Sequence, residues 1–420
     1  KVIDRIASIY EKQGSDCWFT DDPKVFLGDD YNPNEYEKLK DIVEVWFDSG
    51  STHSFVLEKR KDLKWPADMY LEGSDQHRGW FHSSLLESCG TRGKAPFKSI
   101  LSHGFVVDGK GMKMSKSMGN VISPDDILKN YGADILRVWT SASDYSEDLR
   151  IDKNILIQHA ESYRKIRNTF RFMLGNLKDK FEKQDFEKIN LAEFDELEQF
   201  ILHKLSIISN SVTENLKSYN FHKLYKELLN FCALDLSSFY FDIRKDVLYC
   251  DSINSKKRKN CVVVLNIILE SLLKWFAPIL VFTTEEIYSL VNKKNESIHE
   301  NNFVKIPNNW KNDKLNEKWS NLFKIKQEIN IAIEEKRTSK EIGSSLEAEI
   351  KLSINKEKFE LLNDIDLAEY FIVSKAEKKL SEQDRIEIEV SKAKGSKCER
   401  CWKILENKCE RCSNLAGSKL

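Results

Sequence analysis

Apolar residues change their spacing along the chain, and each spacing predicts an element. The first segment, 2–10, places them on one face of a helix. Short apolar runs at 42–47, 69–71 and 100–107 predict buried strands, and a polar loop follows the first of them. Between the second and third runs, residues 80–86 return to helical spacing. A strand, a turn and a helix in this order form half of a nucleotide-binding crossover, so this part of the chain predicts an α/β fold.

The pattern becomes helical from about residue 154 onward. It predicts long helices over 154–177, 221–249 and 262–290, the last bent or broken near Pro278. A polar, asparagine-rich stretch at 292–314 then predicts a linker. The fold class expected is therefore α/β first and mostly α afterwards.

The last hundred residues alternate between the two spacings. A helix is expected over 317–336, an alternating strand over 348–354, a short helix over 357–362 and a strand over 386–390. Together these elements predict a small α/β module near the end of the chain.

Composition removes several classes of protein. The 420 residues include 66 basic and 67 acidic ones, so any nucleic-acid surface must be local. The longest apolar stretch, 262–282, contains charged and polar residues and predicts a buried helix rather than a membrane span. Of nine cysteines, five are scattered and four lie together at the end, which is not the pattern of a secreted disulfide framework. We expect a cytoplasmic protein with no membrane partner.

One loop carries the most informative pattern. Residues 101–120 read LSHGFVVDGKGMKMSKSMGN and include Gly104. The centre of this stretch holds two lysines and two hydroxyls: Lys113, Ser115, Lys116 and Ser117. A glycine-flanked loop with fixed positive charge suits a polyphosphate whose charge shifts during a reaction. A solvated basic loop is the alternative interpretation.

A second group lies where the predicted strand 69–71 meets its helix. Glu72, Gly73 and Asp75 form an acidic turn, and the carboxylates there can accept hydrogen bonds from ribose hydroxyls or from a substrate ammonium. They could equally cap the helix. Trp46, taken alone, reads as a core aromatic. On the helix 154–177, arginines lie opposite the apolar face and are either solvated surface or contacts to RNA phosphates: Arg164, Arg167 and Arg171.

The cysteines at the end form two Cys-x-x-Cys knuckles, Cys398 with Cys401 and Cys409 with Cys412. Two such knuckles can enclose one tetrahedral Zn²⁺, and four protein ligands make that site structural rather than catalytic. A redox pair is the competing interpretation. Residues 391–420 contain eight Lys or Arg against three Glu, which together with Trp402 suits contact with RNA.

Several motifs resemble one family. Residues 113–117 read KMSKS, a motif of class I aminoacyl-tRNA synthetases, and residues 45–53 and 71–81 read VWFDSGSTH and LEGSDQHRGWF. These stretches, and FCALDLSSFYFDIRKDVLY at 231–249, resemble the isoleucyl-tRNA synthetases of bacterial type. The resemblance is very specific over 42–123 and weaker toward residue 397.

The resemblance implies the second half of a Rossmann-like class I catalytic core, a helical anticodon-binding bundle, an α/β junction module and a zinc-binding tail. The divisions expected are a connector from an editing insertion (1–40), the core with its KMSKS loop (41–122), a stem-contact segment (123–153), the anticodon-binding domain (154–300), the junction module (301–390) and the tail (391–420).

The resemblance also implies roles for residues. Lys116, supported by Lys113, would stabilise the triphosphate of ATP and the departing pyrophosphate, with Mg²⁺ accompanying the nucleotide. The remaining residues of the ATP site would be Gly104, Ser115 and Ser117. The aminoacyl-adenylate would lie against Trp46, Glu72, Gly73, Asp75, Gln76 and Trp80.

The partners implied are ATP, L-isoleucine and tRNA(Ile), bound by a monomer. Lys1 is not an initiator residue and no His-Ile-Gly-His-like motif is found in the sequence, so we expect a C-terminal portion that is inactive without an N-terminal half. The alternatives are a valyl or leucyl enzyme and a non-catalytic RNA-binding remnant.

Overall fold

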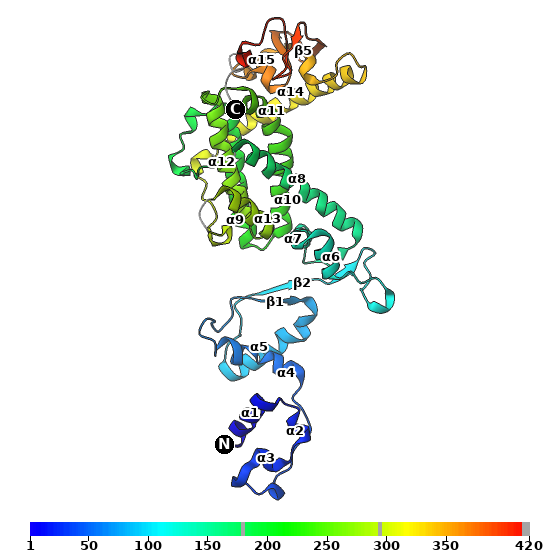
Figure 1. Ribbon diagram of the computed structural model, residues 1–420, viewed down its shortest axis with the longest axis vertical. Coiled ribbons are helices and arrows are strands. Elements are labelled where there is room, and N and C mark those ends of the chain that lie inside the picture. The colour runs from blue at the N-terminus through cyan, green and yellow to red at the C-terminus, as the bar shows by residue number, and fades with distance from the viewer. Residues whose placement is uncertain (178–180, 293–295, 414–420) are drawn as a thin grey trace. The chain divides into compact units, whose positions relative to one another are not determined.

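The computed structural model describes residues 1–177, 181–292 and 296–413 (Figure 1). The described residues are mostly helical and contain four small sheets. They form two compact units, Lys1–Phe105 and Val106–Leu420, and each is described by itself. The division falls inside the core segment expected over 41–122, and the expected tail residues 414–420 lie outside the described residues.

The first unit begins with three short helices, α1 (Val2–Gln13), α2 (Cys17–Thr20) and α3 (Pro23–Leu27). Asp22 caps α3 by accepting a hydrogen bond from the Lys24 amide at 2.9 Å, and Pro23 occupies the first helical position. The guanidinium of Arg5 donates to the Leu27 carbonyl and pairs with Asp30 at 3.1 Å, which fastens α1 to α3.

A parallel pair of strands forms the rest of this unit. β1 (Tyr70–Gly73) and β2 (Ile100–His103) are joined by α5 (Trp80–Arg92), as the strand-turn-helix pattern predicts. The strand predicted over 42–47 is wrong, because helix α4 (Val45–Gly50) begins within it. The Glu44 carboxylate accepts from the Trp46 amide at 2.7 Å and starts this helix, while Ile42 and Val43 are exposed.

The single strand predicted over 100–107 is also wrong. β2 ends at His103, and the second unit begins with a separate strand, β3 (Val106–Asp108), which pairs in parallel with β4 (Leu149–Ile151). Between these two strands lie α6 (Pro124–Tyr131) and α7 (Ala133–Ala142). Ser123 caps α6 by accepting a hydrogen bond from the Asp125 amide at 3.2 Å, and Pro124 occupies the first helical position.

Helices make up the centre of the second unit (Figure 1). They are α8 (Lys153–Leu177), α9 (Glu196–Lys217), α10 (Phe221–Asn230), a π-helical segment (Phe231–Tyr240), α11 (Phe241–Cys250), α12 (Lys256–Phe276) and α13 (Val281–Val291). The predicted break near Pro278 is confirmed by the end of α12 and the start of α13. Residues 264–276 of α12 are all buried, so this helix is the core around which the others pack.

The stretch predicted as a linker over 292–314 is packed rather than free. In its described part, Ile298 and Trp310 are buried in the same hydrophobic core as the helices. Apolar residues at isolated positions inside a polar stretch do not produce a periodic signal, which is why the pattern hid them.

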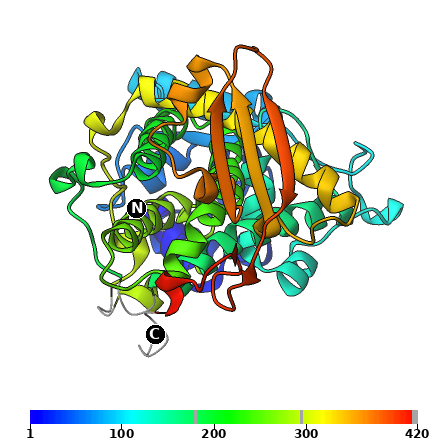
Figure 2. The same cartoon turned by 90° about the horizontal axis from the view of Figure 1, so that it is seen from above.

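The last module combines α14 (Asp313–Thr338) with a mixed sheet of order β6-β5-β7. Its strands are β5 (Ala348–Ile354), β6 (Lys375–Leu380) and β7 (Glu387–Lys392), with α15 (Lys356–Leu361) and α16 (Leu367–Tyr370) between the first two. Helix α14 packs against the sheet (Figure 2). A small hairpin of β8 (Ser396–Lys397) and β9 (Ile404–Leu405) and the short α17 (Glu410–Ser413) carry the cysteines.

The expectation for the long apolar stretch is confirmed. Among the described residues, every helix is too short or too polar to cross a membrane.

Candidate active site and metal centre

The acidic turn of the first unit lies at the carboxyl end of β1. Glu72 is the third residue of the strand and is exposed, and no side-chain hydrogen bond to it is found within the described residues. Asp75 is exposed as well, and its carboxylate accepts from the Gln76 amide nitrogen at 3.0 Å. The Gln76 amide oxygen in turn accepts from the Trp80 backbone N–H at 3.0 Å. Gln76 therefore caps the start of α5 and fixes one Asp75 oxygen.

Two tryptophans meet beside this turn. The ring of Trp46 packs on Gly79, where a methyl group would lie 3.0 Å from Trp46 Cη2, so only glycine allows this approach. Trp80 stacks on Tyr70 with ring centres 4.2 Å apart, and its indole N–H donates to the Ser49 carbonyl at 2.9 Å. The structure thus gathers Trp46 of α4, Gln76 of the turn Ser74–Arg78 and Trp80 of α5, close to the end of β1.

A buried polar chain supports the tryptophans, and the sequence pattern did not single it out. The Tyr70 hydroxyl bonds to Ser84 Oγ at 3.1 Å, and His53 Nδ1 lies 3.0 Å from the Gly50 carbonyl. His53 is buried, and its Nε2 has no partner within the described residues. Burial raises the pKa of the Tyr70 hydroxyl, so this hydroxyl keeps its proton at neutral pH.

The signature loop, residues 109–120, belongs to the second unit and follows β3. Asp108 organises its first half, because one carboxylate oxygen accepts from the Lys110 and Met112 amides at 3.0 and 2.8 Å. The other oxygen accepts from the Asn120 side chain at 2.9 Å. The Asn120 oxygen accepts from the Ser115 amide at 2.9 Å, and its nitrogen also donates to the Lys113 carbonyl at 3.2 Å.

These bonds join both ends of the signature loop to its centre. The Asn120 side chain is the main hydrogen-bond donor that lowers the pKa of Asp108 below its usual value. Lys113 and Lys116 are exposed and make no ion pair within the part of the chain that the structure describes. Ser115 caps the short turn Lys116–Met118, and its hydroxyl lies 3.1 Å from that of Ser117.

The predicted site residues therefore fall into two groups. Glu72, Gly73 and their neighbours belong to the first unit, together with Gly104, whose carbonyl lies 2.8 Å from the His103 ring. The two lysines and two serines belong to the second unit.

The arginines of α8 lie on its solvent face. Arg164, Arg167 and Arg171 are exposed, while the opposite face, including Ile166 and Phe170, is buried. Arg167 donates to the Tyr163 hydroxyl at 3.0 Å and pairs with Glu286 at 3.3 Å, and these contacts raise its pKa. Arg164 and Arg171 make no such pair within the described residues.

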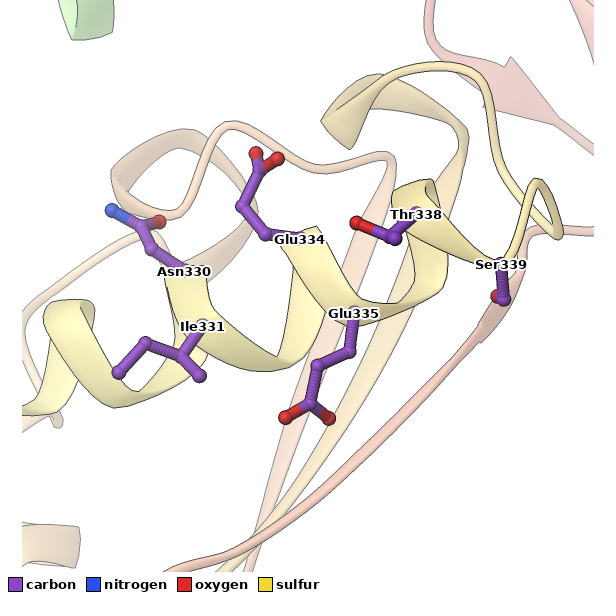
Figure 3. A pocket seen from close by; sticks show the side chains of 6 residues that line it. All are labelled: Asn330, Ile331, Glu334, Glu335, Thr338 and Ser339. Atoms are coloured by element: carbon purple, nitrogen blue, oxygen red, sulfur yellow. The ribbon is translucent and has the colours of Figure 1, made fainter.

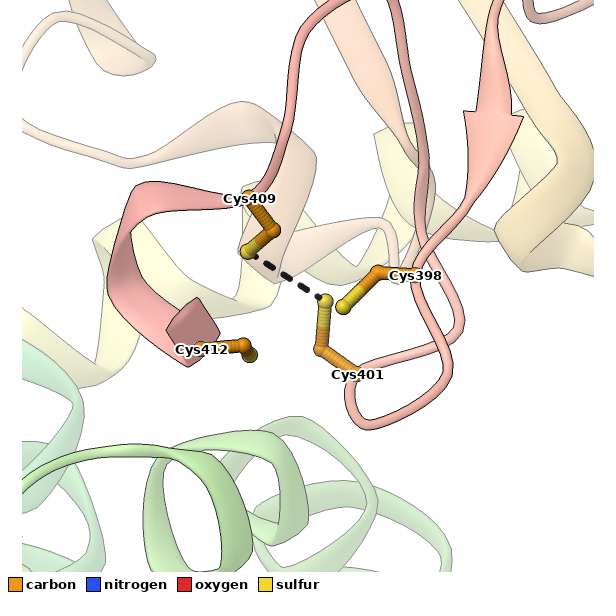
Figure 4. A group of neighbouring side chains, drawn as sticks. All are labelled: Cys398, Cys401, Cys409 and Cys412. Atoms are coloured by element: carbon orange, nitrogen blue, oxygen red, sulfur yellow. Dashed lines mark hydrogen bonds between the residues drawn. The ribbon is translucent and has the colours of Figure 1, made fainter. Parts of the chain in front are cut away.

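The four cysteines of the tail converge (Figure 4). Their Sγ atoms all lie within 4.8 Å of one another, and those of Cys401 and Cys409 are 3.9 Å apart. Thiolates about 2.3 Å from a tetrahedral Zn²⁺ are separated by roughly 3.8 Å, so the arrangement fits that ion. Although burial opposes it, backbone N–H groups lower the pKa of Cys398 to about 7, which favours the ligating thiolate.

Two further features define this metal centre. Gly395, which precedes the hairpin, has a φ of 120° and lies against the Leu405 backbone, where no side chain fits. Cys250 of α11 packs against the four thiols, but burial raises its pKa to about 11 and keeps it a neutral neighbour.

The surface of α14 also carries a hollow (Figure 3). It is lined by Asn330, Ile331, Glu334, Glu335, Thr338 and Ser339. These side chains point away from one another rather than toward a common centre, so we assign no chemistry to it.

Comparison with known proteins identifies relatives of the whole chain. The model of the tRNA synthetases class I (I, L, M and V) matches residues 1–152, and that of the anticodon-binding domain of tRNA ligase matches residues 198–352. The chain is 64% identical over 403 residues to an isoleucine–tRNA ligase of Pelagibacter ubique, and 47% identical over 375 residues to one of Mesorhizobium japonicum.

These alignments cover 96% and 89% of this chain but 44% and 37% of the relatives, so the chain spans less than half of their length. A solved LeuRS of Agrobacterium radiobacter K84, in a ternary complex with tRNA and LeuAMS, has a TM-score of 0.52 at 17% identity. That match covers 64% of this chain and 33% of the other, and it supports the fold alone.

Proposed function

We propose, from the premise that this chain belongs to the isoleucine–tRNA ligases of the class I tRNA synthetases, that it supplies part of the machinery that joins isoleucine to its tRNA. The observation that carries the proposal is the signature loop. Its two exposed lysines project from a backbone that Asp108 and Asn120 hold in one arrangement. The roles that the following paragraphs assign to site residues, to domains and to partner molecules are part of the same proposal.

The reaction has two steps. A carboxylate oxygen of isoleucine attacks the α-phosphorus of ATP, which forms the acyl-phosphate bond of isoleucyl-adenylate and releases pyrophosphate. A hydroxyl of the terminal adenosine of tRNA(Ile) then attacks the acyl carbon, and AMP leaves with the bonding electron pair while the hydroxyl loses its proton. No side-chain nucleophile is required, because positioning and charge stabilisation lower the barrier.

In the first step negative charge builds on the leaving pyrophosphate. Lys116, with Lys113 in support, would stabilise that charge, and Ser115, Ser117 and Gly104 would border the nucleotide. The free ammonium groups of the two lysines fit this role because they have no carboxylate partner within the described residues. Mg²⁺ bound to ATP would neutralise part of the phosphate charge.

The turn after β1 would hold the activated amino acid. Glu72 and Asp75 would accept hydrogen bonds from the substrate ammonium or the ribose, with Gly73 permitting a close approach and Gln76 fixing Asp75. Trp46 and Trp80 would form an apolar wall for the branched side chain. Such a wall separates two aliphatic side chains that differ by one methylene by only about 1–3 kcal/mol.

The two remaining groups would serve the tRNA and the stability of the fold. Arg164, Arg167 and Arg171 would contact tRNA phosphates from α8, within a helical anticodon-binding domain. Cys398, Cys401, Cys409 and Cys412 would hold one structural Zn²⁺, which supplies folding free energy to a segment with little core of its own.

The test is isoleucine-dependent exchange between ATP and pyrophosphate. The chain is assayed alone and mixed with the segments of the Pelagibacter relative that it does not match, with isoleucine, valine and leucine compared. We expect exchange only in the mixture and a preference for isoleucine. Lys116→Ala should lower the rate by about 10²–10³-fold, as expected for loss of a charge-stabilising group. Lys129→Ala, an exposed lysine on α6, is the matched control and should leave the rate unchanged.

A folded, metal-loaded mixture that binds tRNA without catalysing exchange would contradict the proposal. That result would favour a non-catalytic RNA-binding protein. Exchange that is fastest with valine or leucine would instead assign the chain a different amino acid.

A further inference from the structure

The two cysteine knuckles share more than their ligands. Each reads Cys-Glu-Arg-Cys, so an arginine precedes the second cysteine in both, at Arg400 and Arg411. Both arginines reach the same element, the C-terminal end of helix α11. The repeated position and the common target indicate that the two side chains act together.

Arg411 makes the stronger contact. Its two terminal nitrogens donate to the two carboxylate oxygens of Asp246 at 2.7 and 2.9 Å, a bidentate pair. One of the nitrogens also donates to Asp251 at 3.2 Å, just beyond the end of α11. The side chains of Asp246 and Asp251 are only 23% and 15% exposed, so each carboxylate would be left poorly solvated without the arginine.

Arg400 contacts the backbone of the same helix. It donates to the Tyr249 carbonyl at 3.0 Å, one of the last carbonyls of α11, which have no partner within the helix. The Cys250 thiol donates in the other direction, to the Arg400 carbonyl at 3.7 Å, and packs against the four cysteines. The last turn of α11 therefore contacts both knuckle arginines and the sulfur cluster.

We propose that Arg411 and Arg400 are docking residues that fasten the cysteine site to the end of α11, so that helix and knuckles retain the metal together. The knuckles cannot open to release an ion without first leaving α11. The proposal does not depend on the ligase reaction. It also revises the expected role of the basic tail, because Arg411 already pairs with two carboxylates and is not free for RNA phosphates.

The experiment measures the rate at which the zinc-loaded full chain loses metal to an excess of a chromogenic chelator. Arg411→Gln should accelerate release by about tenfold, the effect of losing one charge-assisted hydrogen-bonded pair. Arg411→Lys should lie between wild type and Arg411→Gln, because one ammonium cannot bind both Asp246 oxygens in the bidentate geometry. Arg385→Gln is the matched control, an exposed arginine of the same module that pairs with no carboxylate in the described residues.

A second measurement separates docking from general destabilisation. Asp246→Asn should also accelerate release, and the double variant with Arg411→Gln should release no faster than Arg411→Gln alone, because both changes break one contact. Alkylation followed at the Cys250 peptide should become faster in the same variants.

Unchanged metal release in Arg411→Gln would overturn the proposal, and so would additive effects in the double variant. If Arg411→Gln cannot be loaded with zinc at all, Arg411→Lys and Asp246→Asn provide the same comparison.

Discussion

Asp108 and Asn120 illustrate how two polar side chains can fix an exposed loop. Together they make five hydrogen bonds to one another and to the backbone of residues 110–115. Neither residue carries the charge that the proposed reaction uses. They determine the backbone from which Lys113 and Lys116 project, and we therefore regard them as positioning residues.

The hydrogen bonds to Asp108 predict a pH dependence. Because they lower its folded-state pKa, the carboxylate stabilises the loop at neutral pH, and this contribution is lost only as pH falls through the lowered value. The Met112 amide signal in NMR should therefore titrate below roughly pH 3.9, the ordinary aspartate value. Asn120→Ala removes the largest cause of the shift and should move the midpoint up toward that value. Asn130→Ala, on α6, should not, and an unmoved midpoint in Asn120→Ala would refute the role of Asn120.

Residue patterns indicated the candidate site residues but not the residues that support them. KMSKS and the cysteine knuckles are recognisable because their residue types imply their partners. Asp108, Asn120 and His53 cannot be recognised from the sequence in this way, because each acts through contacts that only the fold creates.

At the scale of elements, helices were predicted well because an apolar stripe repeated over several turns matches the period of a helix and of little else. The short elements were not. The apolar run 42–47 predicts a strand, but the Glu44 side chain caps a helix that begins at Val45. Strand β6 was missed because KAEKKL is highly charged. It pairs in parallel with β5, and Lys375 also donates a hydrogen bond to Glu349 of that strand at 3.1 Å. Tertiary pairing decides such segments.

Helix α13 depends on a cap that comes from another helix. Its own N-terminal residue provides none, and Asp134 of α7 instead accepts from the Phe282 and Thr283 amides at 3.2 and 2.8 Å and from the Thr283 hydroxyl at 2.6 Å. Asp134→Ala should lower the free energy of unfolding by about 2 kcal/mol, because it leaves buried donors without an acceptor. Urea unfolding provides the measurement.

Asp126→Ala is the control for that experiment, since Asp126 is exposed on α6, and it should cost less than about 0.5 kcal/mol. Equal losses in the two variants would show that Asp134 is not a cap of special importance.

At the scale of the whole molecule, charge is nearly balanced, with a formal net charge of −1. The proposed contacts with tRNA would therefore rest on local groups such as the exposed arginines of α8. The division into two units was not predictable, because the strand pattern ran across it at residues 100–107. A period-2 pattern over 100–107 predicts strand structure but does not specify which other strand each half of the run pairs with.

The proposed role of α8 predicts a change in salt dependence. Arg164→Gln with Arg171→Gln should weaken tRNA binding about equally for different tRNA sequences, because phosphates carry no sequence information. The slope of log K against log salt concentration should fall in magnitude by about 1–2. Lys379→Gln with Arg385→Gln, two exposed residues of the last module, should leave the slope unchanged. A large loss of affinity with an unaltered slope would argue against phosphate contacts.

The burial of α12 over residues 264–276 constrains how the polypeptide can be dissected. A fragment that ended before Lys256 would keep α8 to α11 but lose the buried helix α12 that packs among them. A fragment that began at Lys256 would expose the apolar surface of α12 to water. Both halves would be prone to aggregate. Efforts to express the helical region separately should therefore retain everything from α8 through α13 as an indivisible block.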